Sequence, residues 1–270
     1  MVIDLAPLQV ASGQAPRLTR RDPGDRLGLT GKAESRKLRD ALHDELEDLH
    51  GRLWAEAKRS VLLVLQGVDT SGKDGVIRRV LTGLNPQGCS VTSFKAPTTL
   101  ELEHDYLWRV HNACPARGRL GVFNRSHYED VVAARVLGIV DEPHWRRRYR
   151  HMRDFEQMLA DEGTTVVKVF LNISREEQRQ RLQARLDDPT KRWKFRIEDL
   201  EARTQWDAYQ SAYEDAITET STEVAPWWIV PSDRKWVRDL VVETLLLETL
   251  RRLDPQFPPA DPSLDGVIVE

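Results

Sequence analysis

The residues with the clearest capacity for chemistry lie in one short stretch before residue 80. Gly67, Gly72 and Lys73 have the spacing of a phosphate-binding loop, in which a glycine, four residues, a second glycine and a lysine follow one another. Glycines let the backbone approach phosphate oxygens closely, and the lysine supplies a positive charge. The stretch could also be a turn that merely links a strand to a helix. We predict phosphate contacts from Gly67, Thr70, Ser71, Gly72, Lys73, Asp74 and Gly75.

Two acidic residues stand beside this lysine. Asp69 would repel phosphate directly, so it suggests either a magnesium ion between the two or an accepting phosphate or hydroxyl group; the alternative is an Asx turn. Asp74 occupies the position where Ser or Thr normally supplies a magnesium-bound hydroxyl. It could stabilise the helix dipole or support the metal indirectly, and the sequence leaves both interpretations open.

A second group of polar residues follows the apolar run 120–123. Arg125 is a candidate for neutralising charge while a phosphoryl group moves. Glu129 and Asp130 could take part in the chemistry, or could simply be favoured by the dipole of a helix that begins there. Thr98 and Arg109, near the loop after the second strand, are further candidates for nucleotide contacts.

A third group is strongly basic and surrounds a break between two long helical segments. Small kinases carry a mobile lid at such a break, which closes over phosphates, although a basic run can also be a solvated surface. We expect a lid over residues 179–196. Its basic residues are Arg179, Arg181, Arg185, Lys191, Arg192, Lys194 and Arg196, of which we predict that Arg185, Lys191, Arg192 and Lys194 bind phosphate.

The elements that must position these groups can be read from apolar periodicity. Short runs rich in β-branched residues predict strands at 61–66, 90–94, 120–123, 164–173 and 227–230. Helical segments separate them, and these include single helices over about 71–84, 101–112 and 196–220. This alternation predicts an α/β fold with a five-stranded parallel sheet flanked by helices. We expect an extended arm over 1–32, one domain over 33–258 and a tail over 259–270.

Composition limits the possible functions. Forty Lys and Arg oppose 43 Asp and Glu, so the net charge of −3 argues against general coating of nucleic acid. Two cysteines predict no disulfide framework, and no long apolar run predicts a membrane anchor. We expect a cytoplasmic protein.

Three segments together resemble the polyphosphate kinase 2 family: GVDTSGKDG, FNRSHYEDV and RLDDPTKRWKF. The resemblance covers about residues 32–258, and the form of the second segment is most similar to class III members, which accept both AMP and ADP. It implies a P-loop kinase with a thymidylate-kinase-like fold and a helical lid. It also implies that the protein acts with Mg²⁺ to transfer the terminal phosphate of inorganic polyphosphate to a nucleotide, giving ADP and ATP, and that it forms a homo-oligomer.

On this resemblance, the catalytic residues would be Asp69, Lys73, Arg125 and Asp130, with Asp69 and Asp130 also holding the metal. Nucleotide contacts would come from Thr98, Arg109, Asn124, Ser126 and Glu129. An ATP-dependent nucleoside monophosphate kinase is the alternative, although Asp74 in the magnesium-ligand position counts against it. A polyanion-binding protein without catalytic activity is a third hypothesis.

Overall fold

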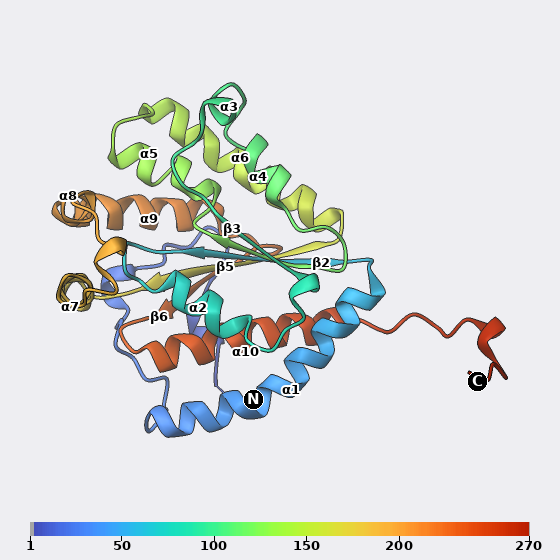
Figure 1. The fold of residues 1–270 in the computed structure, drawn as a ribbon. Helices are drawn as coiled ribbons and strands as arrows, with labels where there is room; N and C mark the ends of the chain where they lie inside the picture. Colours follow the sequence, from blue (N-terminus) through green and yellow to red (C-terminus); the bar gives the residue numbers. More distant parts are fainter. Residues whose placement is uncertain (1–2, 270) are drawn as a thin grey trace.

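The computed structural model describes residues 3–269, and a six-stranded mixed sheet forms its centre (Figure 1). The strands lie in the order β1-β6-β5-β2-β4-β3. They are β1 Gln9–Val10, β2 Ser60–Gln66, β3 Cys89–Ser93, β4 Leu120–Asn124, β5 Thr164–Asn172 and β6 Trp227–Pro231. All neighbouring pairs are parallel except β1 with β6. The sequence prediction of five strands was therefore one short, because two residues of β1 are too few to show a period.

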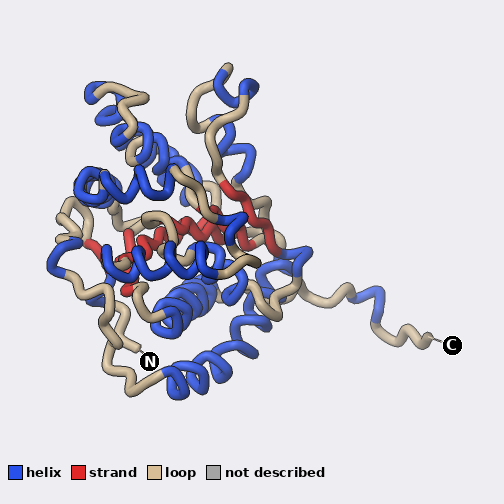
Figure 2. The backbone as a smooth tube through the Cα atoms, turned by 60° about the vertical axis from the view of Figure 1, so that its left-hand side comes forward, coloured by secondary structure: helices blue, strands red, loops and turns tan. Residues whose placement is uncertain are grey.

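Helices cover both faces of the sheet. The helices are α1 Lys32–Glu56, α2 Lys73–Val80, α3 Thr99–Leu102, α4 Trp108–Ala113, α5 Ala133–Val136, α6 Glu142–Asp161, α7 Arg175–Asp187, α8 Glu198–Thr204, α9 Trp206–Thr220 and α10 Lys235–Leu253. Helices α1, α2 and α10 lie on one face, and α4, α5, α6 and α9 lie on the other (Figure 1). Figure 2 shows the strands enclosed between the two layers and the end of the chain extending away from them.

Strand β2 explains why both layers are needed. All seven of its residues are buried, and successive side chains point to opposite faces of the sheet. Val61, Leu63 and Leu65 join the core under α1 and α10, whereas Leu62 and Val64 join the core under α6 and α9. A strand with this pattern is stable only when apolar helices cover both sides.

Two segments predicted as single helices are interrupted. The expected helix over 101–112 is divided into α3 and α4 at Asp105, whose carboxylate accepts a hydrogen bond from the Leu107 amide instead of continuing the helix. The expected helix over 196–220 is divided into α8 and α9 at Gln205. The helix after the phosphate loop also begins later and ends earlier than expected, at Lys73 and Val80.

The segment before α1 packs on its own domain. Ile3, Leu5 and Leu8 are buried in the core that α1 and α10 form, and β1 extends the sheet beside β6. At the other end of the chain, the residues that follow Pro255 as far as 269 are exposed. Within residues 3–269, no helix combines the length and the apolar character that crossing a bilayer requires.

The parallel pairing brings the polar residues together at one edge of the sheet. Leu65 of β2 pairs with Asn124 of β4, and Asn124 pairs in turn with Ser93 of β3. The loops after these strands therefore leave the sheet side by side. Ligands of open parallel sheets bind at this edge, and the candidate site lies there.

Candidate active site

The loop between β2 and α2 depends on glycine at two positions. Gly67 has a φ of +144°, and a Cβ atom there would lie 2.9 Å from the carbonyl oxygen of Leu171. Gly72 has a φ of +107°, and its Cβ would lie 1.8 Å from Nη1 of Arg238. Both backbone conformations are favourable only for glycine. The loop also holds Thr70 at a φ of +65°, a conformation that is uncommon for a residue with a side chain.

Lys73 is the central cation of this loop. Its Nζ donates hydrogen bonds to the carbonyl oxygens of Gly67, at 2.7 Å, and Val68, at 3.3 Å. Burial, and secondarily the charge of Arg125, lower the pKa of Lys73 to about 8. The ammonium group is thus held within the loop, where an arriving phosphate group would stabilise its charged form.

Arg125 follows β4 and reaches the same place from the neighbouring strand. It has a φ of +63°, and its guanidinium lies 2.5 Å from the carboxylate of Asp69 and 3.6 Å from that of Glu129. The charges of Glu129 and Asp69 raise the pKa of Arg125, although burial opposes them. The sequence predictions for Asp69, Lys73 and Arg125 thus converge in space, with Glu129 beside them.

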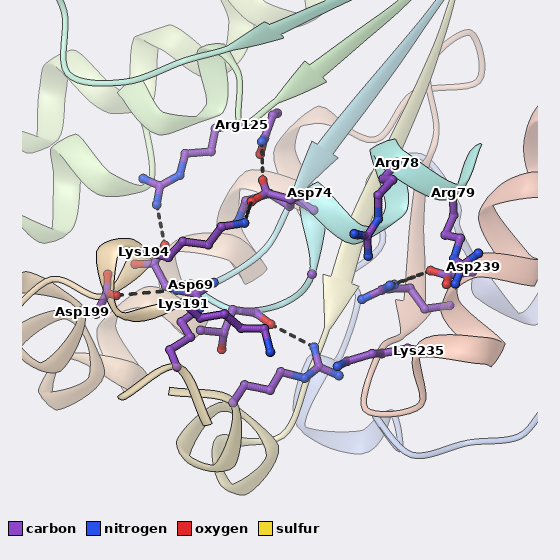
Figure 3. A pocket seen from close by; sticks show the side chains of 18 of the residues that line it. Asp69, Asp74, Arg78, Arg79, Arg125, Lys191, Lys194, Asp199, Lys235 and Asp239 are labelled. Carbon is purple, nitrogen blue, oxygen red and sulfur yellow. Dashed lines mark hydrogen bonds and ion pairs between the residues drawn. The ribbon is translucent and has the colours of Figure 1, made fainter. Parts of the chain in front are cut away.

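Asp74 connects three elements. From the first turn of α2, it accepts a hydrogen bond of 2.8 Å from Nδ2 of Asn124, at the end of β4. Its other carboxylate oxygen lies 3.7 Å from Nζ of Lys194 in the lid. Figure 3 shows Asp74 and Lys194 side by side. The residue that replaces the usual Ser or Thr therefore links the start of α2 to β4 and to the segment predicted as a lid.

These groups line a cleft with a volume of about 1970 Å³. Its lining includes most of the predicted site: Asp69, Thr70, Gly72, Lys73, Asp74, Gly75, Asn124, Arg125, Arg185, Lys191 and Lys194. A cavity of about 40 Å³ adjoins it, and its lining is Gly67, Val68, Asp69, Arg125, Glu129, Gln178, Ala202, Trp206, Tyr209 and Tyr213.

The charge of the large cleft is opposite to that of the whole chain. Sixteen Lys and Arg residues line it, against nine Asp and Glu, whereas the chain has a net charge of −3. Basic side chains from α2, the lid and α10 point into the same space, as Arg78, Arg79, Lys191, Lys194 and Lys235 show (Figure 3). A cleft with this excess of positive charge attracts polyanions.

Six other predicted site residues do not line either cavity. Asp130 is half-buried between Arg109 and Arg148, at 3.7 and 3.8 Å, and desolvation raises its pKa. Thr98 caps α3 through the Glu101 amide, and Arg109 donates to the carbonyl oxygen of Lys95. Each of these side chains has a partner within the protein, so their predicted roles in catalysis and binding remain predictions.

The other three are Ser71, Ser126 and Arg192. Ser126 is buried and bonds to Gln66 and to the Tyr128 amide, and Arg192 donates to the carbonyl oxygen of Leu186. Ser71 is fully buried in the loop, and its hydroxyl oxygen, like that of Thr70, has no hydrogen-bond partner among the described residues. Buried hydroxyl groups without partners are unusual in proteins, and they leave room for contacts with a bound group.

Sequence reasoning missed several basic residues of the cleft. Arg78 and Arg79 lie on α2, one to two turns after the phosphate loop, where helical spacing could have revealed them. Arg39, Lys235 and Arg238 lie on α1 and α10, more than 25 residues from the loop in sequence. Only the packing of α1 and α10 beneath the sheet brings these residues to the site.

Fold and cleft together define an α/β protein with a basic cleft beside a glycine-containing loop, at the edge of a parallel core sheet. The model of the Polyphosphate kinase 2 family matches residues 30–258. The chain belongs to the polyphosphate kinase 2 family.

Characterised relatives and solved structures support this assignment. The chain is 52% identical over 254 residues to an AMP/ADP-polyphosphate phosphotransferase of Meiothermus ruber, a match that covers 94% of this chain and 95% of the relative. It is 46% identical to an ADP-polyphosphate phosphotransferase of Rhodopseudomonas palustris, covering 82% and 80%. The crystal structure of Polyphosphate Kinase 2 from Arthrobacter aurescens TC1 is similar with a TM-score of 0.90 and 46% identity, covering 94% of this chain and 91% of that one.

Proposed function

We propose that this protein is a P-loop kinase with a thymidylate-kinase-like fold that transfers the terminal phosphate of inorganic polyphosphate to AMP and ADP. The observation that carries the proposal is the basic cleft that ends at Lys73. A nucleoside triphosphate offers only three phosphate groups, whereas the sixteen basic side chains of the cleft, most of them from α1, α2, α7, α10 and the lid, suit a longer polyanion. The names of the Meiothermus ruber and Rhodopseudomonas palustris relatives support the same reaction.

The positions of the charged groups suggest where each substrate lies. Polyphosphate would follow the basic side chains of α2 and α10 and end at the phosphate loop. The accepting nucleotide would place its phosphate beside Arg125 and Asp69, at the mouth of the small cavity. That cavity has a volume of about 40 Å³, which is too small for a nucleoside, so the rest of the acceptor would occupy the large cleft.

Catalysis in this arrangement would consist mainly of positioning and charge neutralisation. The acceptor oxygen of AMP or ADP is already ionised near neutral pH, so no strong base is needed. Lys73 and Arg125 would hold the transferring phosphate in line with the acceptor and stabilise its charge. The lid, through Lys191 and Lys194, would exclude water and so limit hydrolysis.

Magnesium is part of the proposal. No group of three or more His, Cys, Asp or Glu side chains in residues 3–269 could by itself hold a metal ion. Mg²⁺ needs no such group, because it usually binds through one or two carboxylates, water and substrate phosphates. Asp69 would hold it, with the partnerless hydroxyl groups of Thr70 and Ser71 nearby in the loop. Bound Mg²⁺ would neutralise phosphate charge. Asp130, turned toward Arg109 and Arg148, would need to move to take part.

The proposal is tested by incubating the protein with polyphosphate, Mg²⁺ and AMP or ADP, without ATP, and separating the nucleotides. We expect ADP and ATP to form, and we expect EDTA to stop the reaction. Lys73→Ala should lower turnover by at least about 10²-fold. Phosphorylation of AMP by ATP alone, with no reaction from polyphosphate, would instead support the ATP-dependent kinase. Size-exclusion chromatography with light scattering tests the proposed homo-oligomer.

A further inference from the structure

Helix α7 holds the phosphate loop from one side, through two side chains. Nε2 of Gln178 donates to the carbonyl oxygen of Asp69 at 3.2 Å. Nη1 of Arg181 donates to the carbonyl oxygens of Thr70, at 2.9 Å, and Ser71, at 3.0 Å. Three successive carbonyl groups of the loop thus bond to two side chains that lie three positions apart on one face of α7.

Both side chains are themselves fixed in place. Gln178 is 2% exposed, and its Oε1 accepts a hydrogen bond of 2.9 Å from Arg203 of α8. Arg181 pairs with Glu177 at 2.7 Å, and its Nη2 donates to the carbonyl oxygens of Ser232 and Asp233, between β6 and α10. Arg181 therefore ties together the phosphate loop, the base of the lid and the start of α10.

These bonds determine which way the loop amides point. In a trans peptide, the C=O and N–H groups point in opposite directions. The bonds to the carbonyl groups of Asp69 and Ser71 therefore direct the N–H groups of Thr70 and Gly72 away from α7. Among the described hydrogen bonds, neither of these two amides has an acceptor. Carbonyl groups in the reverse orientation would repel an anion, so the direction of these two peptides matters for binding.

The loop also needs support of this kind because its backbone is strained. Thr70 has a φ of +65°, a conformation that is unfavourable for a residue with a side chain and persists only where surrounding contacts enforce it. The carbonyl of this same residue bonds to Arg181. A charge-assisted hydrogen bond is stronger than a neutral one. Arg181 supplies two such bonds, one to the carbonyl oxygen of Thr70 and one to that of Ser71.

We propose that Gln178 and Arg181 are positioning residues, which hold the phosphate loop in its anion-binding conformation by binding the carbonyl groups of Asp69, Thr70 and Ser71. This inference rests on the proposed function only in that the anion is a phosphate group of the substrate. Arg181 acts through the loop backbone, and its basic charge at the cleft wall is secondary to that role.

The test compares Arg181→Met and Gln178→Leu with Arg179→Met, a control on the same helix. Arg179 is exposed and bonds only to Glu176 among the described residues. We expect the first two variants to speed hydrogen exchange of the peptide that covers residues 67–73 and to lower kcat by about 10- to 100-fold, since small displacements at a reacting group have effects of this size. Arg179→Met should match the wild type in both measurements, and Arg181→Lys should recover part of the loss.

A second comparison separates positioning from direct binding. If Arg181→Met raised only the KM for polyphosphate and left both kcat and loop exchange unchanged, Arg181 would be a substrate contact and the proposal would be wrong. If Arg181→Met failed to fold, Gln178→Leu would give an independent result, because Gln178 carries no charge. Unchanged hydrogen exchange of the loop in Gln178→Leu would also overturn the proposal. If the wild type transferred no phosphate from polyphosphate, the proposed function would fail, while the exchange comparison would still test the support of the loop.

Discussion

Lys73 combines two properties that rarely occur together in a surface cleft. Its ammonium group is buried and bonded to the loop carbonyl groups of Gly67 and Val68, yet its side chain borders the basic cleft. Burial and the nearby Arg125 lower the pKa of Lys73 to about 8. The charge on which the proposed reaction depends is therefore sensitive to pH just above neutrality.

We predict that polyphosphate binding to the free protein weakens as pH rises through about 8, because the neutral amine cannot pair with phosphate. Above this pH the affinity should approach a tenfold fall per pH unit. The folding stability of the free protein depends on pH in the opposite direction. Between about 8 and 10.5 the unfolded chain binds the extra proton, so Lys73 makes the unfolding free energy rise with pH.

Isothermal titration calorimetry with polyphosphate from pH 7 to 9.5, at constant ionic strength, measures the binding effect. Lys73→Met is the control: it should bind more weakly at pH 7 and should lose most of the pH dependence. If the affinity of Lys73→Met for polyphosphate fell by the same factor over this pH range, the titrating group would be a residue other than Lys73.

At the scale of elements, the phosphate loop and α10 fit together closely. Arg238 of α10 is 3% exposed and bonds to Asp239, and its guanidinium lies against Gly72 and Gly75. The first turn of α2 can reach this position only because neither residue has a side chain. The packing of α10 therefore restricts the backbone at Gly72 and Gly75, while α7 binds the carbonyl groups of the loop.

We predict that Gly72→Ala lowers the unfolding free energy by about 1–3 kcal/mol, because the new Cβ would meet Arg238 and because φ is positive there. Polyphosphate binding should weaken as well. Chemical denaturation measures the first effect and calorimetry the second. Gly51→Ala is the matched control, since no atom lies within 4 Å of its Cβ position in α1; it should stabilise by up to about 1 kcal/mol. Equal effects of the two substitutions would contradict this account.

At the scale of the whole molecule, the segment before α1 completes the domain. Leu8 is 6% exposed and belongs to the core cluster that also contains residues of α1, β2 and α10. Strand β1 covers the free edge of β6. An exposed sheet edge can pair with another chain, so this segment protects the edge as well as the core.

We predict that Leu8→Ala lowers the unfolding free energy by about 2–5 kcal/mol, the range for a buried leucine. Leu264, which is 62% exposed, provides the control, and Leu264→Ala should change stability by less than about 0.5 kcal/mol. Urea unfolding followed by circular dichroism measures both. A small effect of Leu8→Ala would mean that the segment docks only loosely.

The convergence of Lys73 and Arg125 at one edge of the sheet could be predicted, because each lies close in sequence to a recognisable strand. Lys73 follows β2 and Arg125 follows β4, and parallel strands deliver their carboxyl ends to one edge. The direction in which a side chain points was not predictable in the same way. Asp130 is one residue from Glu129, yet it faces Arg109 and Arg148 while Glu129 faces Arg125. The tight turn over His127–Asp130 determines this, and its geometry leaves no periodic signal in the sequence.

The sequence by itself determined the α/β class, the place of the glycine-containing loop after β2 and the family, because apolar periodicity and glycine spacing are local properties of a chain. The tertiary structure alone decided that Arg39, Lys235 and Arg238 belong to the cleft and that Gln178 and Arg181 support the loop. These contacts join segments separated by more than 25 residues. They exist because helices on both faces of the sheet must bury their apolar sides, and that packing fixes where their charged residues lie.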